Sequence, residues 1–240
     1  MRIANKIIVA VLLLEAGIQN YTLASVMEFT EKTTFISATG IPQHSIDFET
    51  LGDGTPIVDG PVPLGGTGQY ISGNEWANEG IYFQPYHSSD SLMVFKDNAN
   101  WTPASGSYGL YIYNDPHESS YVINFSTPVR SFGMMLCDSE FTSPYEKIIL
   151  YNANEQILGT FDFPAYGSVR SGPEANYFRG YLSNDGIAKI VILEAPLESE
   201  GDREGVPLDD IIFTVPEPAT LLLLGLGWVI LKRKNIIKEK

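Results

Sequence analysis

Short runs of apolar and β-branched residues, separated by clusters of Gly, Pro, Asn, Asp and Ser, make up most of the chain between residues 45 and 215. Such runs are typical of β-strands, and the clusters between them are typical of turns. The pattern predicts strands at 45–50, 80–83, 92–96, 109–113, 121–125, 130–137, 147–151, 157–162, 177–182, 188–193 and 210–215. Between the two ends of the chain, apolar residues do not recur at helical spacing over eleven or more positions.

The spacing of these strands predicts an all-β domain, a two-sheet antiparallel β-sandwich of jelly-roll-like form. Residues 148–151 and 190–193 are apolar on both faces, which is typical of central strands or of a sheet covered on both sides. Residues 28–39 alternate in character and are interpreted as an edge strand, and residues 103–108 as a turn.

The first 24 residues have the three parts of a secretory signal. Arg2 and Lys6 precede an apolar run at 7–14, and a small-x-Ala-like cleavage site follows at 22–24. Glu15 is unusual so close to the apolar run and leaves the cleavage position open. We expect a signal helix that is removed by signal peptidase during export.

The last 26 residues have an equally ordered pattern. Pro216, Glu217 and Pro218 precede 13 uncharged residues at 219–231, and Lys232, Arg233 and Lys234 follow. At about 1.5 Å per residue, such a helix would span roughly 20 Å of a hydrocarbon core that is about 30 Å thick. This predicts a hydrophobic helix that is short for a permanent anchor, with its basic end in the cytoplasm.

This tail resembles the PEP-CTERM protein-sorting signal of Gram-negative bacteria, with Val215 directly before the Pro-Glu-Pro triplet. The resemblance implies export by the general secretion machinery and transient anchoring in the inner membrane. It also implies recognition by an exosortase-type membrane protease, cleavage near the triplet, and delivery to the cell surface or the extracellular space. Proteins with this signal are commonly associated with exopolysaccharide, and a similar tail occurs at the C-terminus of some proteins described as ice-binding. Residues 235–240 extend beyond the point where many such tails end.

The expected organisation is therefore a signal peptide at 1–24, a β-sandwich domain at 25–214 and a sorting segment at 215–240. The exported part, taken as 25–218, has 27 acidic and 8 basic residues and a formal net charge of −19. Such a charge disfavours nucleic acid and anionic membranes as partners. It is compatible with solubility alone or with binding of divalent cations.

The residues that support catalysis in other proteins form no recognisable pattern here. Cys137 is the one cysteine, which excludes an internal disulfide, and its apolar surroundings in the sequence predict a buried, inert thiol. His44, His87 and His117 lack the spacing of a transition-metal site, and no G-x-S-x-G elbow is present. We therefore expect a protein that is not an enzyme.

One set of carboxylates could bind calcium. The segment around Glu49, near the start of the domain, and the segment around Asp209 and Asp210, at its end, resemble those of exported carbohydrate-binding or galactose-binding-like sandwiches. In those folds a structural calcium often joins the two ends of the chain, so Glu49, Asp209 and Asp210 are the candidate ligands, with Asp47 a weaker one. In a regular strand Asp209 and Asp210 point to opposite faces, so a shared ion requires a bulge. The alternative is that these carboxylates cap turns.

Aromatic residues of the middle third are candidates for stacking on sugar rings. Trp76 and Trp101 lie beside turn-forming residues, where exposure and burial are about equally expected, whereas Tyr82, Tyr111 and Tyr113 lie within predicted strands and are expected in the core. The leading interpretation is a non-enzymatic, exported surface or matrix protein with exopolysaccharide as the candidate ligand. A purely structural surface protein and a secreted hydrolase remain as alternatives.

Overall fold

The structure is a computed structural model that describes residues 26–40, 44–61, 67–88, 90–96, 103–113, 120–137, 147–163, 176–193 and 207–215. The expected signal helix, Trp101, His117 and residues 216–240 lie outside these ranges. Within them, no helix has the length and apolar character needed to cross a membrane.

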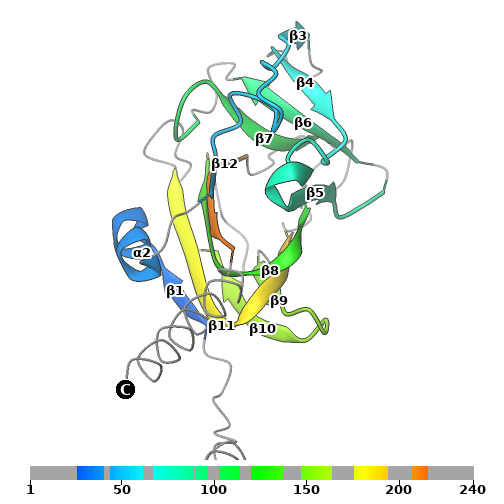
Figure 1. The fold of residues 1–240 in the computed structure, drawn as a ribbon. Coiled ribbons are helices and arrows are strands. Elements are labelled where there is room, and N and C mark those ends of the chain that lie inside the picture. Colours follow the sequence, from blue (N-terminus) through cyan, green and yellow to red (C-terminus); the bar gives the residue numbers. More distant parts are fainter. Residues whose placement is uncertain are drawn as a thin grey trace, which may run out of the picture.

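The described chain is mostly β-strand, which confirms the all-β prediction (Figure 1). Its elements are β1 (Met27–Phe29), α2 (Lys32–Thr39), β2 (His44–Ile46), β3 (Gly60–Pro61), β4 (Thr67–Ile71), η1 (Ala77–Glu79), β5 (Ile81–Pro85), β6 (Ser91–Lys96), β7 (Tyr108–Tyr113), β8 (Tyr121–Leu136), β9 (Lys147–Tyr151), β10 (Ile157–Asp162), β11 (Tyr177–Leu193) and β12 (Leu208–Thr214). The predicted strands at 147–151 and 157–162 have the observed bounds.

The strands form one antiparallel sheet in the order β10-β9-β11-β8-β12-β7-β6-β4-β3, with β1 paired to β11, β2 to β12 and β5 to β8. Two long strands hold it together. The first half of β8 pairs with β5 and with the second half of β11, whereas its second half pairs with β12 and with the first half of β11. Each long strand therefore contributes one half to each of two facing layers (Figure 1).

The structure thus differs from two separate sheets, because the same strands run through both layers. The strands predicted at 121–125 and 130–137 are one strand, as are those at 177–182 and 188–193. The bend lies at Pro128 and at Gly186, which has a φ of 74°. A Cβ on Gly186 would lie 3.0 Å from Cβ of Pro128, so the two strands approach closely where they bend.

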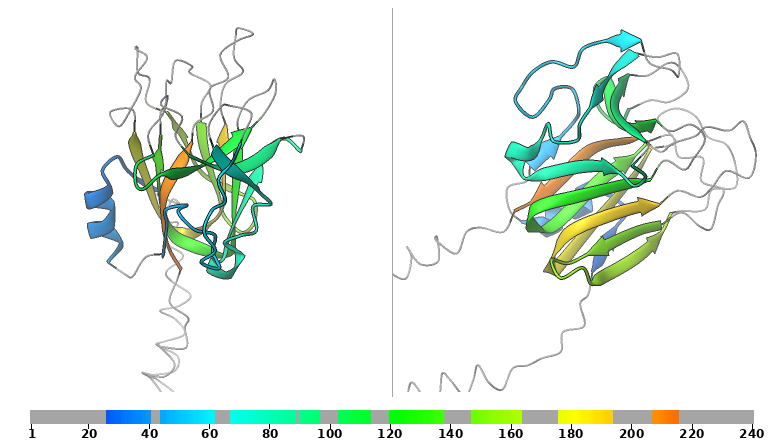
Figure 2. Two further views of the ribbon diagram at one scale, coloured as in Figure 1. Left: turned by 90° about the horizontal axis from the view of Figure 1, so that it is seen from above. Right: turned by 90° about the vertical axis from the view of Figure 1, so that its right-hand side faces the viewer.

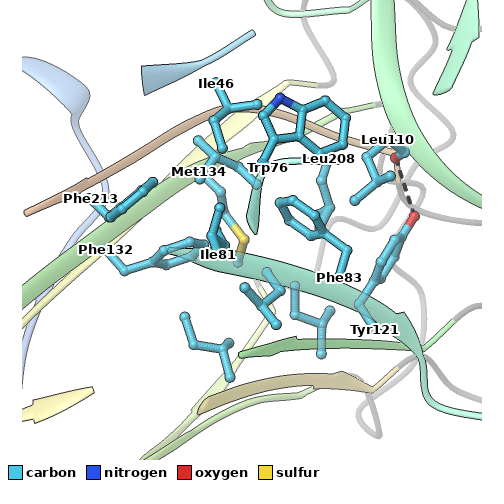
Figure 3. Packing of buried hydrophobic residues seen from close by; sticks show 14 of the residues in the cluster. Ile46, Trp76, Ile81, Phe83, Leu110, Tyr121, Phe132, Met134, Leu208 and Phe213 are labelled. Atoms are coloured by element: carbon cyan, nitrogen blue, oxygen red, sulfur yellow. Dashed lines mark hydrogen bonds between the residues drawn. The ribbon is translucent and has the colours of Figure 1, made fainter. Parts of the chain in front are cut away.

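One hydrophobic core fills the space between the layers (Figure 3). Ile123 and Phe125 come from the first half of β8, and Phe132 and Met134 from its second half. Alternate residues of each half point inward, as expected for strands with one face on a core. The phenol oxygen of Tyr121 lies 3.4 Å from the carbonyl oxygen of Leu110, so this buried hydroxyl has a partner (Figure 3).

Helix α2 covers the outer face of one layer, where an edge strand was predicted, so that prediction is wrong for 32–39 (Figure 2, left). Phe35 of α2 packs on Phe178 and Ile212. The paired glycines Gly133 and Gly180 make room for its ring, since a Cβ on Gly180 would lie 2.6 Å from the Phe35 ring. The helix ends at Gly40, which has a φ of 62°.

Candidate functional site

Strand β12, the last described element, lies in the interior of the sheet. It pairs with β8 along one side, and with β7 at Leu208 and β2 from Ile211 to Phe213 along the other. Leu208, Ile211 and Phe213 belong to the main core, while Ile212 packs on the opposite face with Phe35. The segment that leads into the C-terminal tail is therefore a fully integrated part of the fold.

The end of β12 is fixed by side chains as well as by pairing. Thr214 is fully buried, and its hydroxyl oxygen lies 2.7 Å from that of Ser131 on β8. The His44 ring stacks on Phe213 with ring centroids 5.0 Å apart. One residue later Val215 is 36% exposed, so the chain passes from core to surface within one peptide.

Asp209 and Asp210 both reach the turn at 103–107. The backbone N–H of Ser105 donates to Asp209 Oδ2 at 2.8 Å, and the Ser105 hydroxyl donates to Asp210 Oδ1 at 2.7 Å. In a regular strand two adjacent side chains point to opposite faces, so they could not both contact Ser105. The register of β12 against β8 shifts between Asp209 and Ile212, and Asp210 has a φ of 47°. β12 therefore has the bulge that is needed for Asp209 and Asp210 to face the same site.

Glu49 binds the same turn from the other side. Its Oε1 accepts hydrogen bonds from the backbone N–H groups of Ser107, at 2.5 Å, and Tyr108, at 2.9 Å. Gly106, with a φ of 58°, lies against this carboxylate, and a Cβ there would collide with it. Glu49 follows Phe48, whose φ of 57° turns the chain, so the strand predicted at 45–50 ends at Ile46.

Together these carboxylates hold a turn over a second apolar cluster. Ala104 of the turn packs on the cluster formed by Met93, Phe95, Tyr111 and Cys137. Cys137 is buried, as predicted. The three candidate calcium ligands thus connect residues from β12, the segment after β2 and the turn before β7.

The electrostatics of this site are unusual at Asp209. The side chain is fully buried, and this burial raises the pKa of its carboxyl to about 7, although hydrogen bonds from Ser105 and Asp210 act in the opposite direction. Asp210 is less buried and pairs with Lys32 at the start of α2, with Nζ and Oδ2 2.5 Å apart. Of the two neighbouring carboxyls, only that of Asp210 has a cation against it in the described structure.

Calcium stays a prediction for these residues. The described ranges contain no group of three or more His, Cys, Asp or Glu residues placed to hold a metal ion. Glu49, Asp209 and Asp210 instead accept hydrogen bonds from 105–108, which is the geometry expected if they cap a turn. Sequence reasoning found these carboxylates but missed Ser105, which lies 104 positions from Asp209, and Lys32, which lies 178 positions from Asp210. Neither residue has a motif of its own.

Trp76 cannot be a stacking platform for sugars in this structure. It is 2% exposed and packs edge-on against Phe48, with ring centroids 5.1 Å apart. It also packs edge-on against Phe83, with ring centroids 5.7 Å apart (Figure 3). The prediction of Trp76 as a ligand-binding residue is wrong because the turn that precedes η1 directs the indole into the core. Trp101 lies outside the described residues. The most exposed aromatic side chains that are described are Tyr70 on β4 and Tyr86 after β5.

Comparison with known families identifies the tail. Residues 214–234 match the PEP-CTERM protein-sorting motif. No curated protein matches the chain. The motif implies export to the cell envelope or surface, with processing by an exosortase and the secretion machinery. The matched range begins at Thr214, the last residue of β12, so fold and motif share a residue.

Proposed function

We propose that this protein is a non-enzymatic component of the cell surface or extracellular matrix of a Gram-negative bacterium. The sorting segment anchors it transiently in the inner membrane until an exosortase-type protease releases the folded domain. The domain then acts outside the cell as a structural or polysaccharide-binding component.

The observation that carries this proposal is the continuity of β12 with the sorting motif. Thr214 is buried in the fold and is also the first residue of the matched range. β12 ends at Thr214, and only Val215 separates it from Pro216, the first residue of the Pro-Glu-Pro triplet. A buried strand that leads directly into an address signal supports sorting of the folded domain as cargo.

Fractionation of the native host tests the sorting part. Replacing Pro216, Glu217 and Pro218 together by alanine is expected to leave the protein in the inner membrane with its tail uncleaved. Replacing Lys238, Glu239 and Lys240 by alanine is the matched control, because these residues lie beyond the matched range. Equal release of both variants would remove the sorting role of the triplet.

Polysaccharide is the ligand that we propose for the domain. Exposed aromatic rings suit the apolar faces of sugars, and Tyr70 and Tyr86 are each about half exposed. Trp101 remains a candidate for the same role. Binding to a panel of matrix polysaccharides should weaken in Trp101→Ala or Tyr86→Ala, whereas Val58→Ala, an exposed aliphatic control, should bind as the wild type does. If no polysaccharide binds, the purely structural alternative is favoured.

Thermal unfolding with and without calcium tests whether the domain binds this ion. If Glu49, Asp209 and Asp210 hold calcium, added calcium should raise the unfolding temperature, and Glu49→Gln should abolish this increase. A wild-type unfolding temperature that does not respond to calcium would leave these carboxylates with their turn-capping role alone.

A further inference from the structure

The described chain begins and ends at the same end of the folded sheet. Met27 of β1 is opposite Leu182 of β11, Leu182 is opposite Ser131 of β8, and Ser131 is opposite Thr214 of β12. These four residues form one row across neighbouring strands. With strands about 4.8 Å apart, the first and last residues of the row are separated by roughly 14 Å.

Other strands place their bend-side ends here too. Lys189, just after the bend of β11, is opposite Tyr151, and Tyr151 is opposite Ile157 at the start of β10. We call the surface formed by Met27, the bend residues 126–130 and 183–187, the β9–β10 turn at 152–156, Ile157 and Val215 the bend end. It lies at the bottom of Figure 1, opposite β3 and β4.

The bend end has exposed apolar side chains. Met27 is 52% exposed, Ile157 is 60% exposed and Val215 is 36% exposed. Val26 packs beside Gly159, which brings the start of β1 next to the start of β10. Met27 and Ile157 are therefore on neighbouring strand starts, and Val215 follows the strand at the other end of the row.

Charge at the bend end is nearly balanced, although the domain as a whole is strongly acidic. Glu155 of the β9–β10 turn pairs with Lys189, which lies just outside the bend end, and the exposed Arg130 and Asp185 at the bend are of opposite sign. Strand ends on the opposite side, such as Leu193 and Leu208, flank the connections at 114–119, 138–146, 164–175 and 194–206. The sequences of these four connections contain eleven acidic and two basic residues.

We propose that the bend end is the membrane-facing surface of the domain, and that it lies against the lipid bilayer while the sorting segment is inserted. The inference rests on the proposed function, because the C-terminal segment must enter the membrane. Val215 lies at the bend end and directly precedes Pro216 of the sorting segment. The bend end is therefore the part of the domain nearest the bilayer. Its apolar residues and balanced charge suit contact with lipid, whereas the acidic connections are repelled by anionic headgroups.

Fluorescence quenching of the full-length protein in vesicles of phosphatidylethanolamine and phosphatidylglycerol tests this orientation. Ile157→Cys and Asn184→Cys place a fluorophore at the bend end. Tyr70→Cys and Val58→Cys are controls at exposed positions of the β3–β4 region. Cys137 is fully buried, and labelled wild type measures any background from it. Lipids with a spin label close to the headgroup serve as the quencher.

We expect quenching at 157 and 184 to exceed quenching at 58 and 70 by at least twofold. Equal quenching at all four positions in vesicle-bound protein would overturn the inference and leave the proposed function intact. Protein that does not float with the vesicles would remove membrane insertion of the tail, and both proposals would fail. Introducing Ile157→Asp into the Asn184→Cys variant should lower quenching at 184, and no change would count against contact with lipid.

Discussion

Two residues with left-handed backbone shape the carboxylate site. Phe48 and Asp210 have φ values of 57° and 47°, in a region that costs a non-glycine residue about 1 kcal/mol or more. Phe48 is fully buried against Trp76, and Asp210 pairs with Lys32 and Ser105. These contacts offset the strain and direct Glu49 and Asp210 to the same turn.

Asp209 gives the domain a pH-dependent stability. Because its pKa is about 7 in the folded protein and 3.8 ordinarily, the folded state binds the proton more tightly. Its contribution is therefore fully present below about pH 4 and is lost as pH rises to about 7, at no more than about 1.4 kcal/mol per pH unit. In urea unfolding at pH 4.5 and 8, Asp209→Asn should reduce the difference in unfolding free energy between the two pH values.

The exposed Asp185 supplies a matched control for that measurement. Asp185→Asn removes a carboxyl at the bend end, far from the turn at 103–107, and is expected to retain the wild-type difference. If Asp209→Asn also retained the wild-type difference in unfolding free energy, the carboxyl of Asp209 would not be the group that makes stability depend on pH.

The buried pair Ser131 and Thr214 stabilises the last residue of β12. Thr214→Val leaves the Ser131 hydroxyl buried without this partner, so we expect a loss of about 1–3 kcal/mol in unfolding free energy. Combining it with Ser131→Ala should cost less than the sum of the two single changes. Strict additivity in this double-mutant cycle would mean that the two hydroxyls do not interact.

At the scale of elements, α2 depends on two glycines rather than on its own sequence. The helix has only eight residues, too short to be stable alone, and it is held by Phe35 above Gly133 and Gly180. Gly180→Ala should lower the unfolding free energy by about 1–3 kcal/mol, because the new methyl group displaces the Phe35 ring.

Gly60→Ala in the edge strand β3 is the matched control for α2. A Cβ at Gly60 would have its nearest neighbour at 3.4 Å, so we expect little change. Equal losses from Gly180→Ala and Gly60→Ala would contradict the role assigned to the glycine pair.

β12 sets the point beyond which the tail can be removed. A chain ending at Val215 retains every described element and should unfold at the temperature of the full-length domain. A chain ending at Ile211 loses the buried Phe213 and Thr214, and from the cost of large core truncations we expect it to lose more than about 5 kcal/mol and fail to fold. Circular dichroism and thermal unfolding of the two chains compare them directly, and a folded chain ending at Ile211 would show that the last three residues of β12 are dispensable.

Local patterns predicted most strands, whereas long-range geometry was beyond them. Residues 147–151 and 157–162 are recognisable because each run is short and ends at turn-forming residues. β8 was divided in two because the polar residues around Pro128 resemble a turn, and only the pairing with β11 shows that the chain bends and continues. α2 was missed because its β-branched residues favour a strand. Gly133 and Gly180, on which the Phe35 ring packs, lie far from α2 in the sequence.

The candidate site was predictable to the same degree. The carboxylates Glu49, Asp209 and Asp210 stand out as acidic residues at the two ends of the domain. The turn at 103–107 that all three contact does not stand out in the sequence. These carboxylates reach it because the left-handed backbone of Phe48 and Asp210 directs the chain toward it. Trp76 shows the same limit, since a tryptophan beside a turn is directed inward or outward by contacts with Phe48 and Phe83 that the sequence does not reveal.

For the whole molecule, the arrangement of the described ends matters most. Both ends of the domain lie at the bend end, and the connections with the most acidic sequences join strand ends on the opposite side. Removing the tail after Val215 leaves every described strand in place. The cleavage that we propose would therefore leave the described fold unchanged.

Export of the domain and cleavage of its tail are tested by the intact mass of the protein from its native host, measured separately for membrane and extracellular fractions. We expect an extracellular species that begins near Ser25 and ends near Pro216, and never before Val215. A protein found only in the inner membrane with its C-terminus at Lys240 would contradict it.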